Sequence, residues 1–258
     1  SFLTRALNRE RNQTCWSALS PRALLIIFYL NCVAFILDSS ESSKCCFEKQ
    51  KAFVLKFSTR LAMLPVDFEL RVRMAVVQFS SSVYIEHRFS DFKDLDTFQG
   101  KVSAMNYIGH GTYTTYAITN TTQMLVKETP KNSVRVAVLM TDGVDHPRNP
   151  DVLTAAAEAK GYGIKIFAIG LSSIAQQRQN NAKLRAIASA PPQQFVQSLM
   201  DPLLEEKLLR EMVSVEQWRF YPELLPGRDP PLPPPPIESL CPFIVTENTV
   251  RKYLIKHK

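Results

Sequence analysis

The sequence predicts an α/β protein with a doubly wound, mostly parallel six-stranded sheet, one antiparallel edge strand and helices on both faces. The run 33–37 is entirely apolar, and 134–140 is apolar apart from Arg135. Both stop within two residues of an aspartate, as expected for strands buried on both faces. The runs 70–79 and 83–87 are joined by three serines, which favours an antiparallel hairpin at a sheet edge. Longer segments with a helical period of apolar residues lie between the runs.

The other elements follow from the same patterns, taken in order along the chain. A helix is predicted at 47–64, where residues such as Val54 and Leu61 share one apolar face. The run 164–169 predicts a third buried strand, and 194–196 a short last strand. Further helices are expected at 91–105, 114–128, 150–160, 181–189 and 199–212.

The chain has 258 residues, of which 45% are hydrophobic, and this is enough for one core of about 180 residues with additional ends. We expect an irregular or signal-like segment at 1–30, one domain at 31–214, a proline-rich linker at 215–236 and a basic tail at 237–258. An aberrant or unstructured extension is the alternative for the first segment. Its apolar run is shorter than the roughly 18 residues that a membrane span needs, so we predict no span.

The net charge of +7 is spread along the chain without a compact Lys/Arg block, an aromatic stacking pattern or a zinc-ligand spacing. We therefore expect no nucleic-acid partner, and read the charge as a solvated basic surface with at most a weak attraction for acidic matrix polymers.

The five cysteines include no CxxC pair, which argues against a thiolate metal site. Cys32 stands just before the first predicted strand and Cys241 follows the last predicted helix, so they are candidates for a disulfide; the alternative is that all five are reduced in a cytosolic protein. Cys45 and Cys46 are adjacent, so we do not expect them to pair with each other. One of them is a candidate for a bond to another chain, which would give a disulfide-linked oligomer.

Hydroxyl and carboxylate side chains cluster where the predicted strands give way to helices. Asp38, Ser40 and Ser42 form a D-x-S-x-S pattern after the first strand, Thr112 precedes a helix, and Asp142 follows the second long strand. Oxygen ligands without His or Cys select a hard cation, so we predict Mg²⁺ or Mn²⁺ at this site. Neutral hydroxyls would leave the cation short of negative charge, which an acidic side chain of a partner could supply.

Each of these residues also has a simpler explanation. The serines could cap the helix that starts near residue 47. Thr112 could be an ordinary residue at a helix entry, and Asp142 a turn residue before Gly143. All of these explanations would have to hold together for the metal site to be absent.

The motifs DSSES at 38–42, GHGTYTTYAI at 109–118 and VLMTDG at 138–143 resemble the von Willebrand factor type A domain family, and the resemblance covers about 31–214. The segments are most like the type A domains of the collagen type VI and type XXVIII chains. The resemblance implies a metal-ion-dependent adhesion site, whose first motif matches residues 38–42 and whose threonine and second aspartate match Thr112 and Asp142. His110-Gly111 stands where the family usually has two glycines.

The resemblance implies a secreted, non-enzymatic adhesion module of the extracellular matrix, with matrix proteins, including collagen chains, as partners. Two other functions are compatible with an α/β sheet of this kind. An intracellular type A domain for complex assembly would have reduced cysteines. A metal-dependent phosphohydrolase would use Asp38 as its nucleophile, but Ser40 replaces the second carboxylate that such enzymes carry, and no phosphate-binding loop follows a strand. Asn120 begins an Asn-Thr-Thr pattern and is a candidate for glycosylation.

Overall fold

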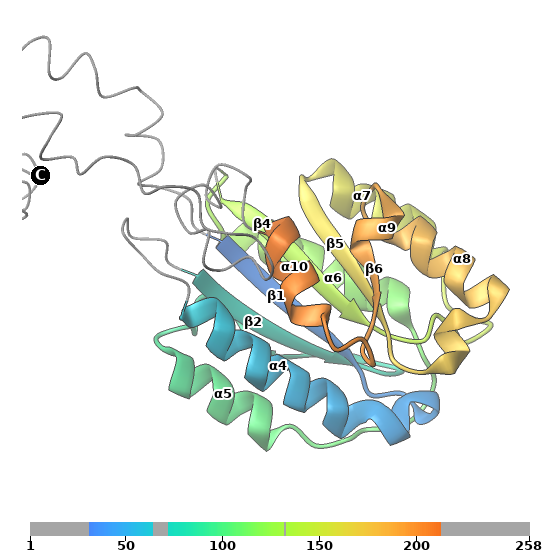
Figure 1. The fold of residues 1–258 in the computed structure, drawn as a ribbon, viewed down its shortest axis with the longest axis horizontal. Helices are drawn as coiled ribbons and strands as arrows, with labels where there is room; N and C mark the ends of the chain where they lie inside the picture. Colours follow the sequence, from blue (N-terminus) through green and yellow to red (C-terminus); the bar gives the residue numbers. More distant parts are fainter. Residues whose placement is uncertain (1–30, 64–71, 132, 213–258) are drawn as a thin grey trace, which may run out of the picture. The chain divides into compact units, whose positions relative to one another are not determined.

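The computed structural model describes residues 31–63, 72–131 and 133–212, and these contain a six-stranded sheet with the strand order β3-β2-β1-β4-β5-β6 (Figure 1). All neighbours pair in parallel except β2 and β3, so the predicted α/β class and its antiparallel edge strand are confirmed. The strands are β1 Asn31–Asp38, β2 Val72–Phe79, β3 Val83–His87, β4 Val134–Met140, β5 Ile164–Gly170 and β6 Val196–Ser198.

The winding direction of the sheet reverses between β1 and β4. From β1 the chain adds β2 and β3 on one side, and then returns to add β4, β5 and β6 on the other. Leu37 of β1 pairs with Met140 of β4, so the carboxyl ends of these two strands lie side by side. Such a switch point is where open α/β sheets bind their ligands.

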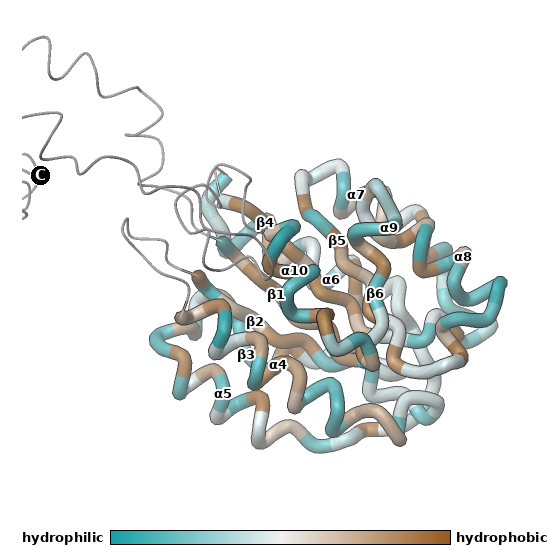
Figure 2. Tube along the Cα trace, in the orientation of Figure 1, coloured by the Kyte–Doolittle hydropathy of each residue, from teal (hydrophilic) through white to brown (hydrophobic). Residues whose placement is uncertain are grey.

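Alternate residues of the strands pack into two hydrophobic layers. In β1, for example, Phe35 faces α4, α5 and α10, while Ile36 faces α6 and α7. Figure 2 shows hydrophobic colour along the strands and hydrophilic stretches on the covering helices. The helices are α4 Phe47–Ala62, α5 Leu95–Ala104, α6 Thr114–Glu128, α7 Val152–Gly161, α8 Arg178–Ile187, α9 Pro192–Phe195 and α10 Leu204–Met212, with 3₁₀ segments η2 Glu41–Cys46 and η3 Ser173–Gln176.

Several predicted boundaries differ from the structure. The helix predicted from residue 91 begins at Leu95, because the Asp94 side chain caps it by accepting a hydrogen bond from the backbone N–H of Thr97 at 2.7 Å. Residues 194 and 195 end a short helix rather than begin the last strand. The final helix begins at Leu204 instead of residue 199, after a turn that contains Pro202. The 3₁₀ segment η2 was not predicted.

The predicted segments 1–30, 215–236 and 237–258 lie outside the described residues, as does Cys241. Within the described residues, no helix is both long and apolar enough to cross a membrane.

Candidate metal-binding site

Asp38 is the last residue of β1, and the structure joins it to the end of β4. The Thr141 hydroxyl donates a hydrogen bond to Asp38 Oδ2 at 2.7 Å, although 103 residues separate the two in sequence. Thr141 is followed directly by Asp142, so this bond brings the two predicted aspartates to the same end of the sheet. The pairing of β1 with β4 is what makes this possible, because both strands stop at the same level.

The first predicted motif folds tightly around Asp38. The backbone N–H of Ser40 donates to Asp38 Oδ1 at 2.9 Å, and the Ser43 hydroxyl donates to the same oxygen at 3.2 Å. The hydroxyls of Ser40 and Ser42 lie 3.1 Å apart. Ser40 occupies the N-cap position of η2 but makes no side-chain capping bond, so the simpler capping explanation for this residue is not supported.

A side chain of helix α4 hydrogen-bonds to the backbone of Asp38. The Gln50 side chain accepts a hydrogen bond from the Asp38 N–H at 3.0 Å and donates one to the Asp38 carbonyl at 2.8 Å. Gln50 is fully buried, so these two bonds are shielded from water. The amide clamp holds the end of β1 in a fixed orientation, and the Asp38 carboxylate with it.

The loop that carries Thr112 is bound to the first motif by backbone hydrogen bonds. Gly109 N–H donates to the Ser39 carbonyl at 2.8 Å, and Glu41 N–H donates to the His110 carbonyl at 2.9 Å. Gly109 and His110 have φ of 89° and 74°, a left-handed conformation that is uncommon for histidine. Two consecutive left-handed residues turn the chain sharply, and the loop therefore returns over the motif.

Thr112 lies at the end of this loop, just before the N-cap of α6 at Tyr113. It is 6% exposed, and its carbonyl accepts a hydrogen bond from His146 N–H at 2.8 Å. Across the described ranges, no side-chain hydrogen bond involves the Thr112 hydroxyl. Its position directly before the N-cap is also that of an ordinary residue at a helix entry, so the simpler explanation for Thr112 stays open.

Asp142 is held by the segment that follows β5. Its Oδ1 accepts hydrogen bonds from the backbone N–H groups of Leu171 and Ser172, both at 2.8 Å, and its Oδ2 accepts one from the Ser172 hydroxyl at 2.6 Å. A carboxylate has about four lone-pair positions, so room remains for a cation or a bridging water. Sequence reasoning missed Ser172, although a serine two residues beyond a buried strand was the available signal.

The two carboxylates are buried without a basic partner. Asp38 is 2% exposed and Asp142 6%, and neither forms an ion pair with any described Lys, Arg or His. Burial raises the pKa of Asp38, while hydrogen bonds from Ser40, Thr141 and Ser43 act in the opposite direction. Two buried carboxylates without a positive counter-charge are costly even when they are hydrogen-bonded, so a divalent cation fits this site electrostatically.

The donor chemistry fits a hard cation as well. Within the described ranges, no three or more His, Cys, Asp or Glu side chains cluster in a way that could hold a metal. A cation at the end of β1 would therefore rely on two carboxylates, the Ser40, Ser42 and Thr112 hydroxyls, and water. Such oxygen donors suit Mg²⁺ and Mn²⁺.

Aromatic rings stack beside Thr112. The ring centroids of Tyr113 and His146 are 5.0 Å apart, and those of Tyr113 and Tyr116 are 6.0 Å apart, with an interplanar angle of 19° in each case. A Cβ atom on Gly111 would come within 3.1 Å of the His146 ring and 3.3 Å of the Tyr113 ring. The glycine therefore leaves room for a flat aromatic surface next to the candidate site, and Tyr116 is 46% exposed on it.

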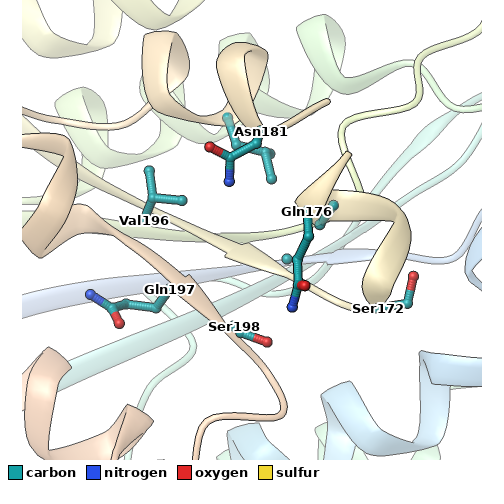
Figure 3. A pocket seen from close by; sticks show the side chains of 9 residues that line it. Ser172, Gln176, Asn181, Val196, Gln197 and Ser198 are labelled. Carbon is teal, nitrogen blue, oxygen red and sulfur yellow. The ribbon is translucent and has the colours of Figure 1, made fainter. Parts of the chain in front are cut away.

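A pocket of about 210 Å³ is lined in part by Ser172, the residue whose hydroxyl donates to Asp142 (Figure 3). Its labelled residues are Ser172, the N-cap of η3, and residues of η3, α8 and β6, and most carry amide or hydroxyl groups, among them Gln176, Asn181 and Ser198. Ser172 lines this pocket and also binds Asp142, so it belongs to both places.

The remaining predicted site residues lie elsewhere. Cys32 is fully buried within β1, not before it; its suggested partner Cys241 is outside the described residues, so this disulfide stays a prediction. Asn120 lies in α6, where its amide donates to the Tyr116 carbonyl at 2.8 Å. Glycosylation of Asn120 also stays a prediction.

Comparison with known proteins identifies the fold family. A model of the von Willebrand factor type A domain matches residues 33–209, more than half of the chain. The chain belongs to this family. The predicted resemblance of this type A domain to those of collagen chains is confirmed, since the collagen alpha-2(VI) chain of Gallus gallus is 30% identical over 167 residues.

Matrilin-3 of Homo sapiens is 30% identical to the type A domain chain over 171 residues, which cover 64% of this chain and 33% of matrilin-3. The match to the collagen alpha-2(VI) chain covers 62% of this chain and 16% of the collagen chain. The chain thus spans a third or less of the length of these relatives.

Among solved structures, the type A domain is similar to proximal thread matrix protein 1 from the mussel byssus. One structure of that protein has a TM-score of 0.56 and 18% identity, and covers 73% of this chain and 48% of its own. Another, with a zinc-occupied metal-ion-dependent adhesion motif, has a TM-score of 0.53 and 19% identity, and covers 70% of this chain and 46% of its own. At these identities the likeness shows the fold alone.

Proposed function

We propose that this type A domain binds a divalent cation through Asp38, Ser40, Ser42, Thr112 and Asp142, and through that cation an acidic residue of a partner protein. The observation that carries the proposal is the burial of Asp38 and Asp142 without a basic partner, at the switch point of the sheet and facing hydroxyl groups. A cation there would balance charge that no described side chain balances.

The ligand set also accounts for the partner's chemistry. Three of the five proposed ligands are neutral hydroxyls. The two carboxylates only balance the charge of a divalent cation, and no further negative charge surrounds it. A carboxylate from outside would complete the coordination and strengthen the electrostatics in a low-dielectric site. Oxygen-only donors favour Mg²⁺ or Mn²⁺, although the zinc-occupied motif of the mussel protein makes Zn²⁺ a useful comparison.

The relatives support an adhesive role outside the cell. Matrilins and collagen chains share the domain, and we propose that this chain is secreted and binds extracellular matrix proteins, including collagen chains. We propose no catalytic role, because Ser40 stands where a phosphohydrolase would need a second carboxylate near Asp38.

Calorimetric titration of the full chain with Mg²⁺, Mn²⁺ and Zn²⁺ tests the cation site. Thr112→Ala is the preferred variant, because the Thr112 hydroxyl makes no side-chain hydrogen bond with any residue that the structure describes, and Thr119→Ala in α6 is its matched control. We expect Thr112→Ala to weaken Mg²⁺ binding at least about tenfold, a loss of about 1.4 kcal/mol, and the control to bind as the wild type does. Wild-type protein that binds none of the three cations would exclude the site.

Binding to immobilised matrix proteins tests the acidic partner. We expect collagen to bind in Mg²⁺ and to be released by a chelator, and collagen with its carboxylates converted to amides not to bind. Equal binding of native and amidated collagen in Mg²⁺ would exclude an acidic residue as the contact.

A further inference from the structure

The two adjacent cysteines of η2 lie in direct contact at the edge of the candidate site. Their sulfur atoms are 3.1 Å apart, and both are free thiols. Cys45 is exposed and Cys46 is 4% exposed. A pair with one accessible and one enclosed thiol, already in contact, is arranged for reaction between them rather than with distant cysteines.

We infer that Cys45 and Cys46 are a redox modification site, which closes to a disulfide between neighbouring residues and thereby changes the hold on Asp142. The two thiols lie on the segment that leads from Ser42 into α4, so a bond between them would act on the candidate site from one side.

The route from the thiols to Asp142 is short. Cys46 Sγ lies 3.8 Å from the Leu171 carbonyl oxygen, and the N–H of the same residue, Leu171, donates to Asp142 Oδ1 at 2.8 Å. A disulfide requires the sulfur atoms to approach by about 1 Å, to the usual bond length of about 2.05 Å. Oxidation also removes the Cys46 S–H, which is the donor to the Leu171 carbonyl, so the contact with the residue that fixes Asp142 changes.

The unequal environments of the two thiols assign their roles. Thiolates are the reactive species, and the exposed Cys45 meets an oxidant first. Burial raises the pKa of the Cys46 thiol to about 11, with a further contribution from Cys45, so Cys46 stays protonated until a sulfur is presented to it. Cys45 is therefore the attacking thiol and Cys46 the resolving one.

With glutathione disulfide as the oxidant, the chemistry balances in two exchanges. The Cys45 thiolate attacks one sulfur of glutathione disulfide, forms a mixed disulfide and releases one glutathione thiolate. Cys46 then gives up its proton and attacks Cys45 Sγ, which forms the Cys45–Cys46 bond and releases a second glutathione. The dithiol loses two electrons and two protons, and one glutathione disulfide becomes two glutathione molecules.

The bond would be readily reversible. Neighbouring Cα atoms are about 3.8 Å apart across a trans peptide, which is shorter than the roughly 4.4–6.8 Å that ordinary disulfides span. The resulting ring is strained, and strained disulfides are the ones that are easily reduced. This strain is why the sequence alone argued against pairing, and it also suits a bond that opens and closes.

Peptide mass mapping of the full chain in graded glutathione buffers tests the bond. Trypsin cuts after Lys44 and Lys49, so both cysteines fall in one peptide of sequence CCFEK that contains no other cysteine. We expect this peptide to lose two hydrogens as the buffer becomes oxidising, and to regain them on reduction. In Cys46→Ser, the Cys45 glutathione adduct should persist, because the resolving thiol is missing.

Two outcomes would overturn the bond. One is a lasting glutathione adduct on Cys45 in the wild type, and the other is a CCFEK peptide linked to a second chain.

The coupling to Asp142 rests on the proposed function, and Mg²⁺ titration of the reduced and oxidised full chain tests it. We expect oxidation to weaken Mg²⁺ binding at least about threefold in the wild type and to leave Cys45→Ser unchanged. Equal affinity in both redox states would overturn the coupling while the disulfide stands. Absence of Mg²⁺ binding in either state would overturn the proposed function and the coupling together, and mass mapping would still decide the bond.

Discussion

The Thr141 hydroxyl donates a 2.7 Å hydrogen bond to the buried carboxylate of Asp38, and so joins the ends of two central strands that are far apart in sequence. Both residues are almost inaccessible to water. A hydrogen bond to a buried charged group is worth more than a neutral one, because the carboxylate has no water to replace the lost donor.

Thr141→Val removes this donor and keeps the shape of the side chain. We expect a loss of roughly 2 kcal/mol in the free energy of unfolding, measured by urea denaturation. Thr119→Val, on the partly exposed side of α6, is the matched control and should change stability by less than about 0.5 kcal/mol. A Thr141 variant as stable as the control would show that water or another donor serves Asp38.

His87 predicts a pH dependence of stability. The ring is 2% exposed and packs edge-on against Phe92 and Phe98, and burial lowers its pKa despite the nearby Asp91 carboxylate. The unfolded chain binds the proton more readily, at its ordinary pKa of about 6.5, so stability is full above that pH and declines as the pH falls below it.

Urea denaturation between pH 8 and pH 5 checks this dependence. His87→Phe should remove the decline below about pH 6.5 that this histidine causes. His110→Asn is the control, because asparagine tolerates the left-handed backbone found there and the site is exposed. If His87→Phe and His110→Asn follow the same pH profile, His87 does not carry the effect.

Glu205 links α10 to α4 by two ion pairs, and their contribution to stability can be measured. Its carboxylate forms ion pairs with Lys56 at 2.7 Å and with Arg60 at 3.3 Å, and its own side chain is only 11% exposed. Because Lys56 is 75% and Arg60 42% exposed, solvent screens the pairs, and we expect Glu205→Gln to cost only about 1 kcal/mol. Glu206→Gln, one residue further along, should cost less, and an equal loss in both variants would mean that net charge matters rather than the clamp.

A substitution at Gly111 tests whether the aromatic surface of Tyr113 and His146 contributes to partner binding. Gly111→Ala places a methyl group against the His146 and Tyr113 rings and should force them apart. We expect large chemical-shift changes for these two rings in NMR spectra and weaker binding to immobilised collagen, with Mg²⁺ affinity changed less than partner affinity. Gly100→Ala is the control, since nothing lies within 4 Å of its Cβ position, and it should leave both spectra and binding unchanged.

Much of the fold could be predicted because its signals are local. The strand predicted at 33–37 is buried on both faces, and its continuous apolar run indicates this directly. The boundaries were less accurate where short polar contacts decide them. A single hydrogen bond to the Asp94 side chain sets the start of α5. Residues 194 and 195 belong to a short helix that follows two prolines. Hydrophobic periodicity predicts neither feature.

The residues proposed as ligands could be named from the sequence, whereas the contacts that support them could not. The five predicted residues stand in motifs at strand ends, and the structure places all of them at the carboxyl end of β1 and β4 or in the loops bound to it. The supporting contacts come from Gln50, Ser172 and the Leu171 backbone. A backbone N–H leaves no mark on the sequence, and a buried glutamine on a helix resembles any other polar residue.

Because Leu171 and Ser172 anchor Asp142, a chain that carries the proposed site must extend at least to Ser172. Those residues come 29 and 30 positions after Asp142, and all five proposed ligands precede them. A fragment or an alternatively spliced product that stopped after Asp142 would contain all five proposed ligands. It would still lack the backbone N–H groups that orient the Asp142 carboxylate. Screening transcripts for the motifs alone would therefore overcount competent domains, and the stretch through β5 and the start of η3 is the better criterion.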